Sequence, residues 1–218
     1  MKHLLLSAFI GLSLMSCTKD RLTANGERTS ETRNLDEFTG VSANGATDVQ
    51  ISYGTEYRVV IKGSSNLIPH FETEVRGGIL YLQYDDVNVR HDDLQVSVTL
   101  PLIDHVSASG SGEIDITGAF PAVDEFRVSV SGSGEVDLER TIEAENARVS
   151  VSGSGNADLE ALRAEDADVE VSGSGEVEIT VYNRLKARIS GSGKIYYNGN
   201  PQVDAEVSGS GKVLKNRD

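Results

Sequence analysis

The chain has 218 residues and is strongly acidic, with 34 Asp and Glu against 20 Lys and Arg and a formal net charge of −14. This charge makes nucleic acid and anionic lipid surfaces poor partners, because both repel an acidic domain. The chain has one cysteine, so it has no internal disulfide.

Residues 1–16 have the features of a lipoprotein signal peptide. A basic start at Lys2 precedes the apolar stretch Leu4–Leu14, which is too short to span a bilayer. The following Leu14-Met15-Ser16-Cys17 has the form of a lipobox and contains the only cysteine. We therefore expect cleavage before Cys17, thioether lipidation of Cys17, and membrane anchoring through the acyl chains. An ordinary secretory signal with a chance cysteine is the alternative.

Residues 17–34 are polar and lack periodicity, which predicts a flexible lipidated tether. Strand patterns begin at Leu35. We expect a β-rich N-terminal half over residues 35–105, in which Arg76-Gly77-Gly78 forms a hairpin turn, and a repeat region over residues 106–218.

Six copies of Ser-Gly-Ser-Gly organise the second half of the chain. Their first glycines lie at residues 110, 132, 153, 173, 191 and 209, so the period is 18 to 22 residues. Each copy is flanked by alternating apolar and polar residues, as in Val128–Leu138, and this alternation is typical of a strand with one buried face. A short period with strand-like content predicts an all-β fold, a single-stranded β-helix or solenoid with one coil per repeat.

The recurring glycines need a structural reason, because glycine weakens a strand. We expect each Ser-Gly-Ser-Gly to form the corner of a coil, with glycine stacked on glycine at about 4.8 Å. Residues 41–51 align without gaps to residues 106–116, with five identities in eleven. The N-terminal half is therefore predicted to be a degenerate continuation of the same architecture.

Together these features resemble the head GIN domain family, described as auto-transporter adhesins. The lipobox, the opening segment Phe38–Val49, the hairpin Val75–Leu80 and the serial Ser-Gly-Ser-Gly coils carry the resemblance, which covers about residues 35–214. The family is common in Bacteroidetes as secreted or lipid-anchored proteins. The resemblance implies a right-handed β-helix and an adhesin in the outer membrane, facing either the cell surface or the periplasm. It supplies no catalytic residues.

The outward positions after each Ser-Gly-Ser-Gly are rich in carboxylates. If the coils stack in register, the first and second outward positions form two adjacent acidic columns. Like charges directly opposite one another are destabilising, and Ca²⁺ with oxygen ligands would relieve the repulsion. The alternative is a solvated acidic face screened by salt within about 8–10 Å. The candidate cation or ligand face consists of Glu113, Asp115, Glu135, Asp137, Asp158, Glu176 and Glu178.

Binding to a glycan or to an extracellular protein is the leading functional interpretation. A structural spacer of the cell envelope, without a ligand, is the second. A small polysaccharide-acting enzyme is the third, because β-helices host such enzymes. The histidines of the expected mature chain, His70, His91 and His105, fit neither a nucleophile–histidine pattern nor metal-ligand spacing, so we expect no enzyme. Tyr196-Tyr197 either stacks on a sugar or lies at the edge of the core.

Overall fold

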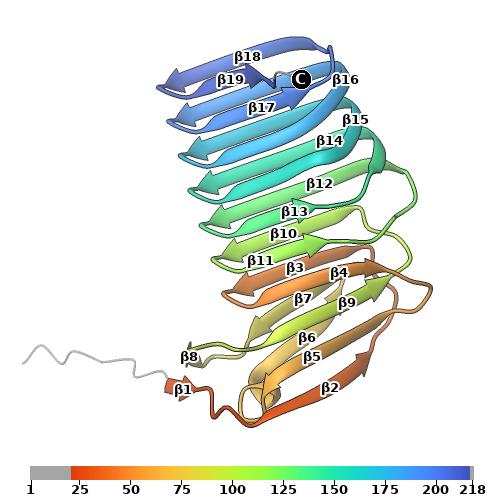
Figure 1. Cartoon of the computed structure of the whole chain (residues 1–218), viewed down its shortest axis with the longest axis vertical. Coiled ribbons are helices and arrows are strands. Elements are labelled where there is room, and N and C mark those ends of the chain that lie inside the picture. The colour runs from red at the N-terminus through yellow and green to blue at the C-terminus, as the bar shows by residue number, and fades with distance from the viewer. Residues whose placement is uncertain (1–20, 217–218) are drawn as a thin grey trace, which may run out of the picture.

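The protein is an all-β solenoid whose coils stack along one long axis (Figure 1). The structure is a computed structural model that describes residues 21–216. The predicted signal peptide and Cys17 lie outside the described residues. In Figure 1 the strands nearest the viewer run from left to right, and the strands behind them run from right to left. The chain proceeds from the bottom to the top of the view, so the coils are right-handed. The predicted fold class is confirmed.

Two sheets form the long faces of the solenoid. The front sheet contains β4 (Asp48–Tyr53), β11 (Glu113–Ile116), β13 (Glu135–Leu138), the first parts of β15 (Asn156–Gly173) and β16 (Glu176–Gly191), β17 (Lys194–Asn198) and β19 (Lys212–Lys215). The back sheet contains β3 (Gly40–Gly45), β10 (His105–Gly110), β12 (Val123–Gly132), β14 (Ile142–Gly153), the later parts of β15 and β16, and β18 (Gln202–Gly209).

Each coil pairs with the next in parallel, and the sequence repeats stay in register. The predicted alignment of residues 41–51 with 106–116 is also the strand register, since Val41 pairs with Val106 and Ile51 pairs with Ile116. The first glycines of the copies are successive Cα partners from one end of the repeat to the other. This series consists of Gly45, Gly110, Gly132, Gly153, Gly173, Gly191 and Gly209.

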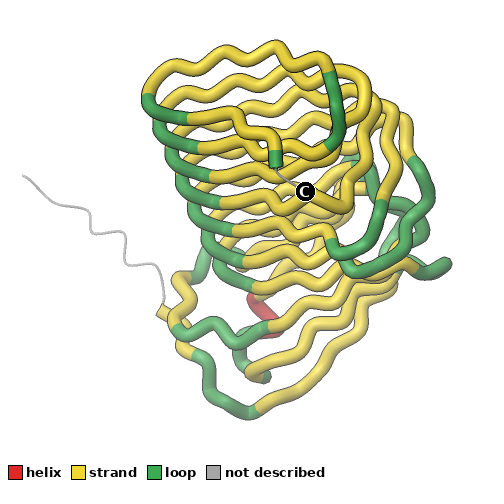
Figure 2. Tube along the Cα trace, turned by 45° about the horizontal axis from the view of Figure 1, so that its top comes forward, coloured by secondary structure: helices red, strands yellow, loops and turns green. Residues whose placement is uncertain are grey.

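The Ser-Gly-Ser-Gly copies form the corners, which stack along one edge of the solenoid (Figure 2). In the copy at 131–134, Gly132 has φ +111°, and a Cβ there would lie 2.5 Å from the carbonyl oxygen of Gly110. At Gly134 a Cβ would lie 2.6 Å from the carbonyl oxygen of Gly112. The backbone N–H of Ser133 donates to the Gly110 carbonyl at 2.8 Å. The predicted corner is confirmed: Gly132 is required by dihedral angle and by space, and Gly134 by space alone.

The inward side chains form one hydrophobic core along the whole stack. It runs from Phe38 near the base to Ile195 near the last coil. Within a coil, alternate residues such as Val128, Val130 and Val136 are at most 2% exposed. Burying a side chain of this size stabilises the fold by about 1.5–3 kcal/mol. The stacked coils are therefore held together by hydrophobic packing as well as by backbone hydrogen bonds.

The N-terminal half continues the solenoid by one level and then changes its pairing. Strands β7 (Ile79–Tyr84) and β9 (Gln95–Leu100) lie parallel to β3 and β4. The strands below them pair antiparallel and close the base, and the hairpin at Arg76-Gly77-Gly78 is confirmed. The remaining elements are β1 (Arg21–Thr23), β2 (Arg28–Asn34), β5 (Arg58–Ser64), the 3₁₀ helix η1 (Ile68–His70), β6 (Phe71–Arg76) and β8 (Asn88–Arg90).

Residues 21–23 form β1, which pairs in parallel with β8. The prediction of a flexible tether over residues 17–34 is therefore wrong for this segment and also for residues 28–34. Residues 28–34 form β2, which pairs antiparallel with β5. The Arg33 guanidinium also donates to the Phe71 carbonyl at 2.6 Å and to Thr73 Oγ1 at 3.2 Å. The alternation that marks other strands is missing because β2 is an edge strand whose side chains are mostly exposed. Backbone hydrogen bonds and one arginine hold it.

The last described coil has an exposed outer side. Every residue of β18 is exposed, including Val203 and Val207 at core positions. None of the described strands pairs with the outer edge of β18 or β19. The charged Lys212 and Lys215 on β19 discourage pairing with another edge.

We predict that Gly132→Ala lowers the free energy of unfolding by about 3 kcal/mol, because the new Cβ meets the Gly110 carbonyl in a backbone conformation unsuited to alanine. Urea denaturation of the purified protein measures the change. Gly77→Ala is the control: Gly77 has φ +58° but no atom within 4 Å of a new Cβ. Only the dihedral cost of about 1–2 kcal/mol should result. Equal losses in both variants would contradict the steric account of the corner.

Candidate ligand-binding flank

The predicted acidic residues lie in two columns on the outer surface of the front sheet. The coils stack in register there, as the prediction required. In the first column Glu113 pairs with Glu135, which pairs with Asn156, followed by Glu176, Lys194 and Lys212. The second column contains Asp115, Asp137, Asp158, Glu178, Tyr196 and Leu214.

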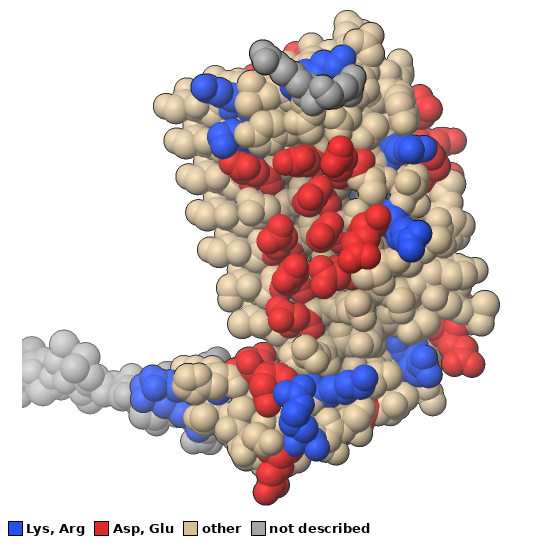
Figure 3. Space-filling view, in the orientation of Figure 1, with Lys and Arg blue, Asp and Glu red and all other residues tan. Residues whose placement is uncertain are grey.

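Three further carboxylates extend this surface, which appears as a continuous red band in Figure 3. Asp48 belongs to the degenerate copy, and its carboxylate accepts the backbone N–H of Glu113 at 3.3 Å. Glu139 and Glu160 stand two residues after Asp137 and Asp158, at the third outward position. The sequence alignment and the same alternation carried two residues further would have identified all three. We call these ten residues, the seven predicted and these three, the acidic flank.

Burial and neighbouring charges raise the pKa values of three carboxyl groups in the second column. Burial raises the pKa of Asp115, and the charge of Glu113 raises it further. The pKa of Asp137 is raised by burial and then by the charges of Asp158 and Asp115. The Glu178 carboxyl also has a raised pKa, from burial and from Asp158. A raised pKa means that folding disfavours the ionised form, so the flank carries an electrostatic cost at neutral pH.

Basic and aromatic side chains close the columns toward the C-terminal end. Lys194 Nζ lies 2.6 Å from Glu176 Oε1 and 5.7 Å from the centroid of the Tyr196 ring. Tyr196 stands on the outer surface above Glu178, whereas Tyr197 packs against the edge of the hydrophobic core. The flank therefore ends in Lys194 and Tyr196, of which the lysine contacts both the tyrosine ring and the last glutamate of the first column.

The flank has no geometry suited to a tightly held metal ion. Within residues 21–216, no group of three or more His, Cys, Asp or Glu side chains is placed to hold one. A parallel sheet fixes the carboxylates in rows and gives them no loop that could wrap a cation. The calcium prediction gains no support from this arrangement.

None of the described histidines is hydrogen-bonded to a serine side chain. Among the described residues, His70 Nδ1 contacts Asp85 Oδ2 at 3.1 Å, and no serine hydroxyl is hydrogen-bonded to that pair. His105 lies on the back sheet, where burial lowers its pKa. A nucleophile with a histidine base within hydrogen-bond reach is the minimum for acyl transfer. The described residues do not provide that arrangement.

Fold and flank define the class of this protein as a β-solenoid with a flat, charged long face. Residues 37–201 match the family described as "Putative auto-transporter adhesin, head GIN domain". The chain belongs to this family, as its sequence features predicted. No curated protein matches the chain.

Solved structures of three bacterial proteins have the same fold. A putative adhesin from Bacteroides fragilis is 20% identical with a TM-score of 0.70, over 89% of this chain and 99% of that one. A putative adhesin from Parabacteroides merdae is 21% identical with a TM-score of 0.65, over 91% and 100%. A putative lipid binding protein from Parabacteroides distasonis is 19% identical with a TM-score of 0.62, over 91% and 100%. At these identities the similarity establishes the fold.

We predict that Asp137→Asn raises the free energy of unfolding at pH 7 by about 0.5 kcal/mol, because it removes a like charge between Asp115 and Asp158. The raised pKa gives the sign: the folded state holds the proton more tightly, so stability falls as pH rises through the folded pKa. The gain should therefore shrink at about pH 3.5, where the carboxyl is largely protonated in both states. Urea denaturation at both pH values measures it.

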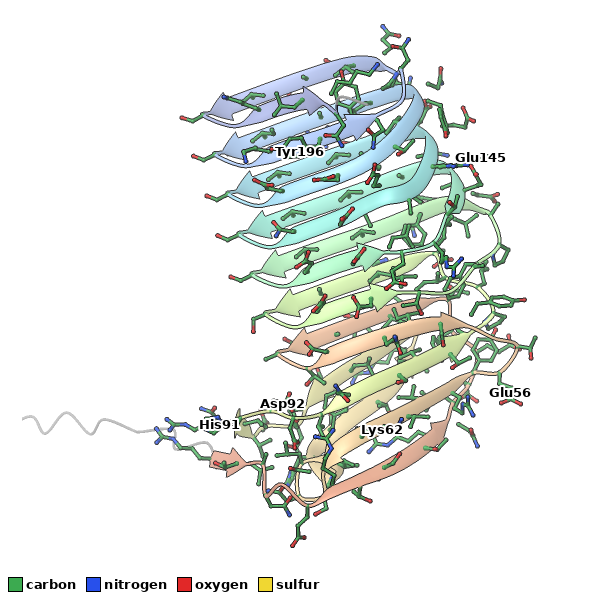
Figure 4. The ribbon with its side chains drawn as sticks, in the orientation of Figure 1. Glu56, Lys62, His91, Asp92, Glu145 and Tyr196 are labelled. Atoms are coloured by element: carbon green, nitrogen blue, oxygen red, sulfur yellow. The ribbon has the colours of Figure 1, made fainter. Side chains whose placement is uncertain are left out.

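The control for this prediction is Glu56→Gln. Glu56 is an exposed acid in the loop after β4, at the side of the molecule and away from the columns (Figure 4). Its substitution should leave stability nearly unchanged at either pH. An Asp137→Asn protein less stable than the parent at pH 7 would show that the columns do not repel.

Proposed function

We propose that this protein is a lipoprotein of the bacterial outer membrane, anchored through Cys17, that binds a glycan or an extracellular protein with its acidic flank. The observation that carries the proposal is the in-register array of carboxylates over successive coils. A rigid sheet holds these charges without further ordering on binding, which reduces the entropic cost of association. Membership of an adhesin family supports the same role. The proposal assigns binding to the flank and no catalysis.

The start of the first described strand at Arg21 supports a short connection between the solenoid and the proposed anchor. Only three residues separate Cys17 from the first described strand at Arg21. A fully extended chain covers at most about 3.6 Å per residue, so lipidation at Cys17 would hold Arg21 within about 15 Å of the lipid attachment. The base of the solenoid would then lie at the membrane, and the later coils would lie further from the membrane. The flank would reach a partner on the outside without a long tether.

A structural role in the envelope is the second candidate. The observation that favours it is the last described coil, where Val203 and Val207 at core positions are 36% and 45% exposed. An uncapped coil with exposed core positions could stack on another protein of the envelope. Location separates the two candidates, because an adhesin has to be reached from outside.

We predict that protease treatment of intact cells removes the domain, detected with an antibody against residues 35–214. The Cys17→Ser variant should leave the membrane fraction, because it lacks the site of lipidation. A periplasmic protein of known location, measured in the same samples, is the control for cell integrity. Survival of the domain on intact cells, with digestion only after the outer membrane is opened, would contradict the adhesin role and leave the structural role.

We predict that binding in a screen of glycans and extracellular proteins depends on the flank. The double variant Asp137→Asn/Glu178→Gln should lose at least about tenfold in affinity for any partner that pairs cations with these columns. Glu56→Gln is the matched control outside the flank. A partner whose affinity is the same for all three proteins would bind elsewhere, and the flank would not be the adhesive surface.

A further inference from the structure

A second candidate site lies on the opposite face of the solenoid, away from the acidic flank. The outer surface of the back sheet contains a groove of about 290 Å³. This volume is close to the lower end of the range of ligand pockets. The groove is lined by His105, Arg127, Ser129, Arg148, Ser150, Asp168, Glu170 and Arg188, together with the backbone of the strands beneath them.

The repeat register creates the groove from two neighbouring columns. The column four residues before the Ser-Gly-Ser-Gly copies begins with His105, Arg127, Arg148 and Asp168. The column two residues closer to the corner contains Ser107, Ser129, Ser150 and Glu170. Long side chains thus stand beside small ones on successive rungs about 4.8 Å apart. The serines leave a hollow whose wall is made by the arginines.

The N-terminal end of the groove is positively charged. Arg127 and Arg148 share one carboxylate, that of Glu125, and Arg148 Nε lies 2.8 Å from Glu125 Oε1. One negative charge for two guanidinium groups leaves a net charge of +1. The shared contact also orients both groups, while their remaining N–H groups have no hydrogen-bond partner among the described residues. Paired arginines bind carboxylate or sulfate groups well because they offer parallel N–H donors.

The C-terminal end of the groove offers acceptors. Arg188 Nη2 lies 2.9 Å from Asp168 Oδ1 and 3.5 Å from Glu170 Oε2, so one guanidinium faces two carboxylates and this end of the groove has a net charge of −1. The two carboxylate side chains remain 43% and 55% exposed. The exposed part of the Asp168 carboxylate is the oxygen that does not face Arg188, because Oδ1 itself is buried. Carboxylates in this state accept hydrogen bonds from hydroxyl groups.

The strands beneath the groove cannot bind a peptide by strand addition. β12 is already paired with β10 and β14, and β14 with β12 and β15, so no backbone edge is free. Recognition has to use side chains alone. A ligand that fits carries one anionic group for the arginines and neutral hydroxyls for the serines, Asp168 and Glu170.

We propose that this groove binds an acidic sugar, with its carboxylate or sulfate held between Arg127 and Arg148 and its hydroxyls directed to Ser129, Ser150 and the carboxylates of Asp168 and Glu170. The site is independent of the acidic flank, and its occupation does not require the flank to be adhesive. An acidic sugar residue of a glycan carries both an anionic group and neutral hydroxyls, and its size fits the groove. The groove would bind acidic sugars more tightly than neutral sugars, because a neutral sugar has no anionic group to pair with the two arginines.

Titration calorimetry on the purified protein tests the proposal with defined probes. The probes are a galacturonic acid trimer for the carboxylate, galactose 6-sulfate for the sulfate, neutral galactose, inorganic sulfate and an oligoglutamate peptide. We expect at least one acidic sugar to bind, and Arg127→Gln or Arg148→Gln to weaken it about tenfold or more. Which acidic sugar binds identifies the anionic group.

Arg163→Gln is the matched control. Arg163 is as exposed as Arg127, at 50% and 52%, and is also paired with a glutamate, Glu143, but it lies outside the groove. Its affinity should stay within about twofold of the parent, and circular dichroism verifies that all variants are folded. The proposal is overturned if no acidic sugar binds, if neutral galactose, inorganic sulfate or the peptide binds as tightly, or if Arg163→Gln loses as much affinity as the groove variants.

Discussion

The structure depends on the contact of one coil backbone with the next at the Ser-Gly-Ser-Gly corners. The carbonyl of Gly110 lies where a side chain on Gly132 would stand, and the same contact recurs between successive copies. Because the backbones approach so closely, each corner N–H reaches the carbonyl of the coil below, as Ser133 reaches Gly110 at 2.8 Å. This contact fixes the register of every other column. A shift of one residue would move the apolar side chains out of the core and onto the surface.

The fixed register has a consequence on each face. On the front sheet it aligns carboxylates with carboxylates, and burial together with the neighbouring charges raises the pKa of Asp115, Asp137 and Glu178. The protein tolerates that repulsion because the buried core stabilises each coil by more than a partly solvated charge pair costs. On the back sheet the same register sets arginines beside serines and produces a groove. The inward positions hold the residues of the core. The character of each outer surface is therefore set by the residues at the outward positions.

Much of the fold and part of the site could be predicted from the sequence. The period of the glycines and the alternation around them predicted the coils, and the gap-free alignment of residues 41–51 with 106–116 predicted their pairing. The acidic columns followed, because a parallel in-register stack repeats the sequence columns in space. β2 was missed, since an edge strand with exposed side chains has no apolar alternation. The antiparallel base was missed because the alternation of side chains does not depend on whether a strand pairs parallel or antiparallel. β5 alternates in either case, and β2 has no alternation.

The sequence by itself determined the repeating unit, the inward and outward residues and the membership of a family. These properties are local or periodic. Because the coils stack with a fixed period, residues at equivalent positions of the repeat lie above one another in the structure. Only the tertiary structure decided which end is closed, how two arginines come to share Glu125, and which polar columns border a hollow. Those features depend on side-chain directions and on contacts between segments distant in the chain. Their physical origin is packing in three dimensions, which a linear pattern does not contain.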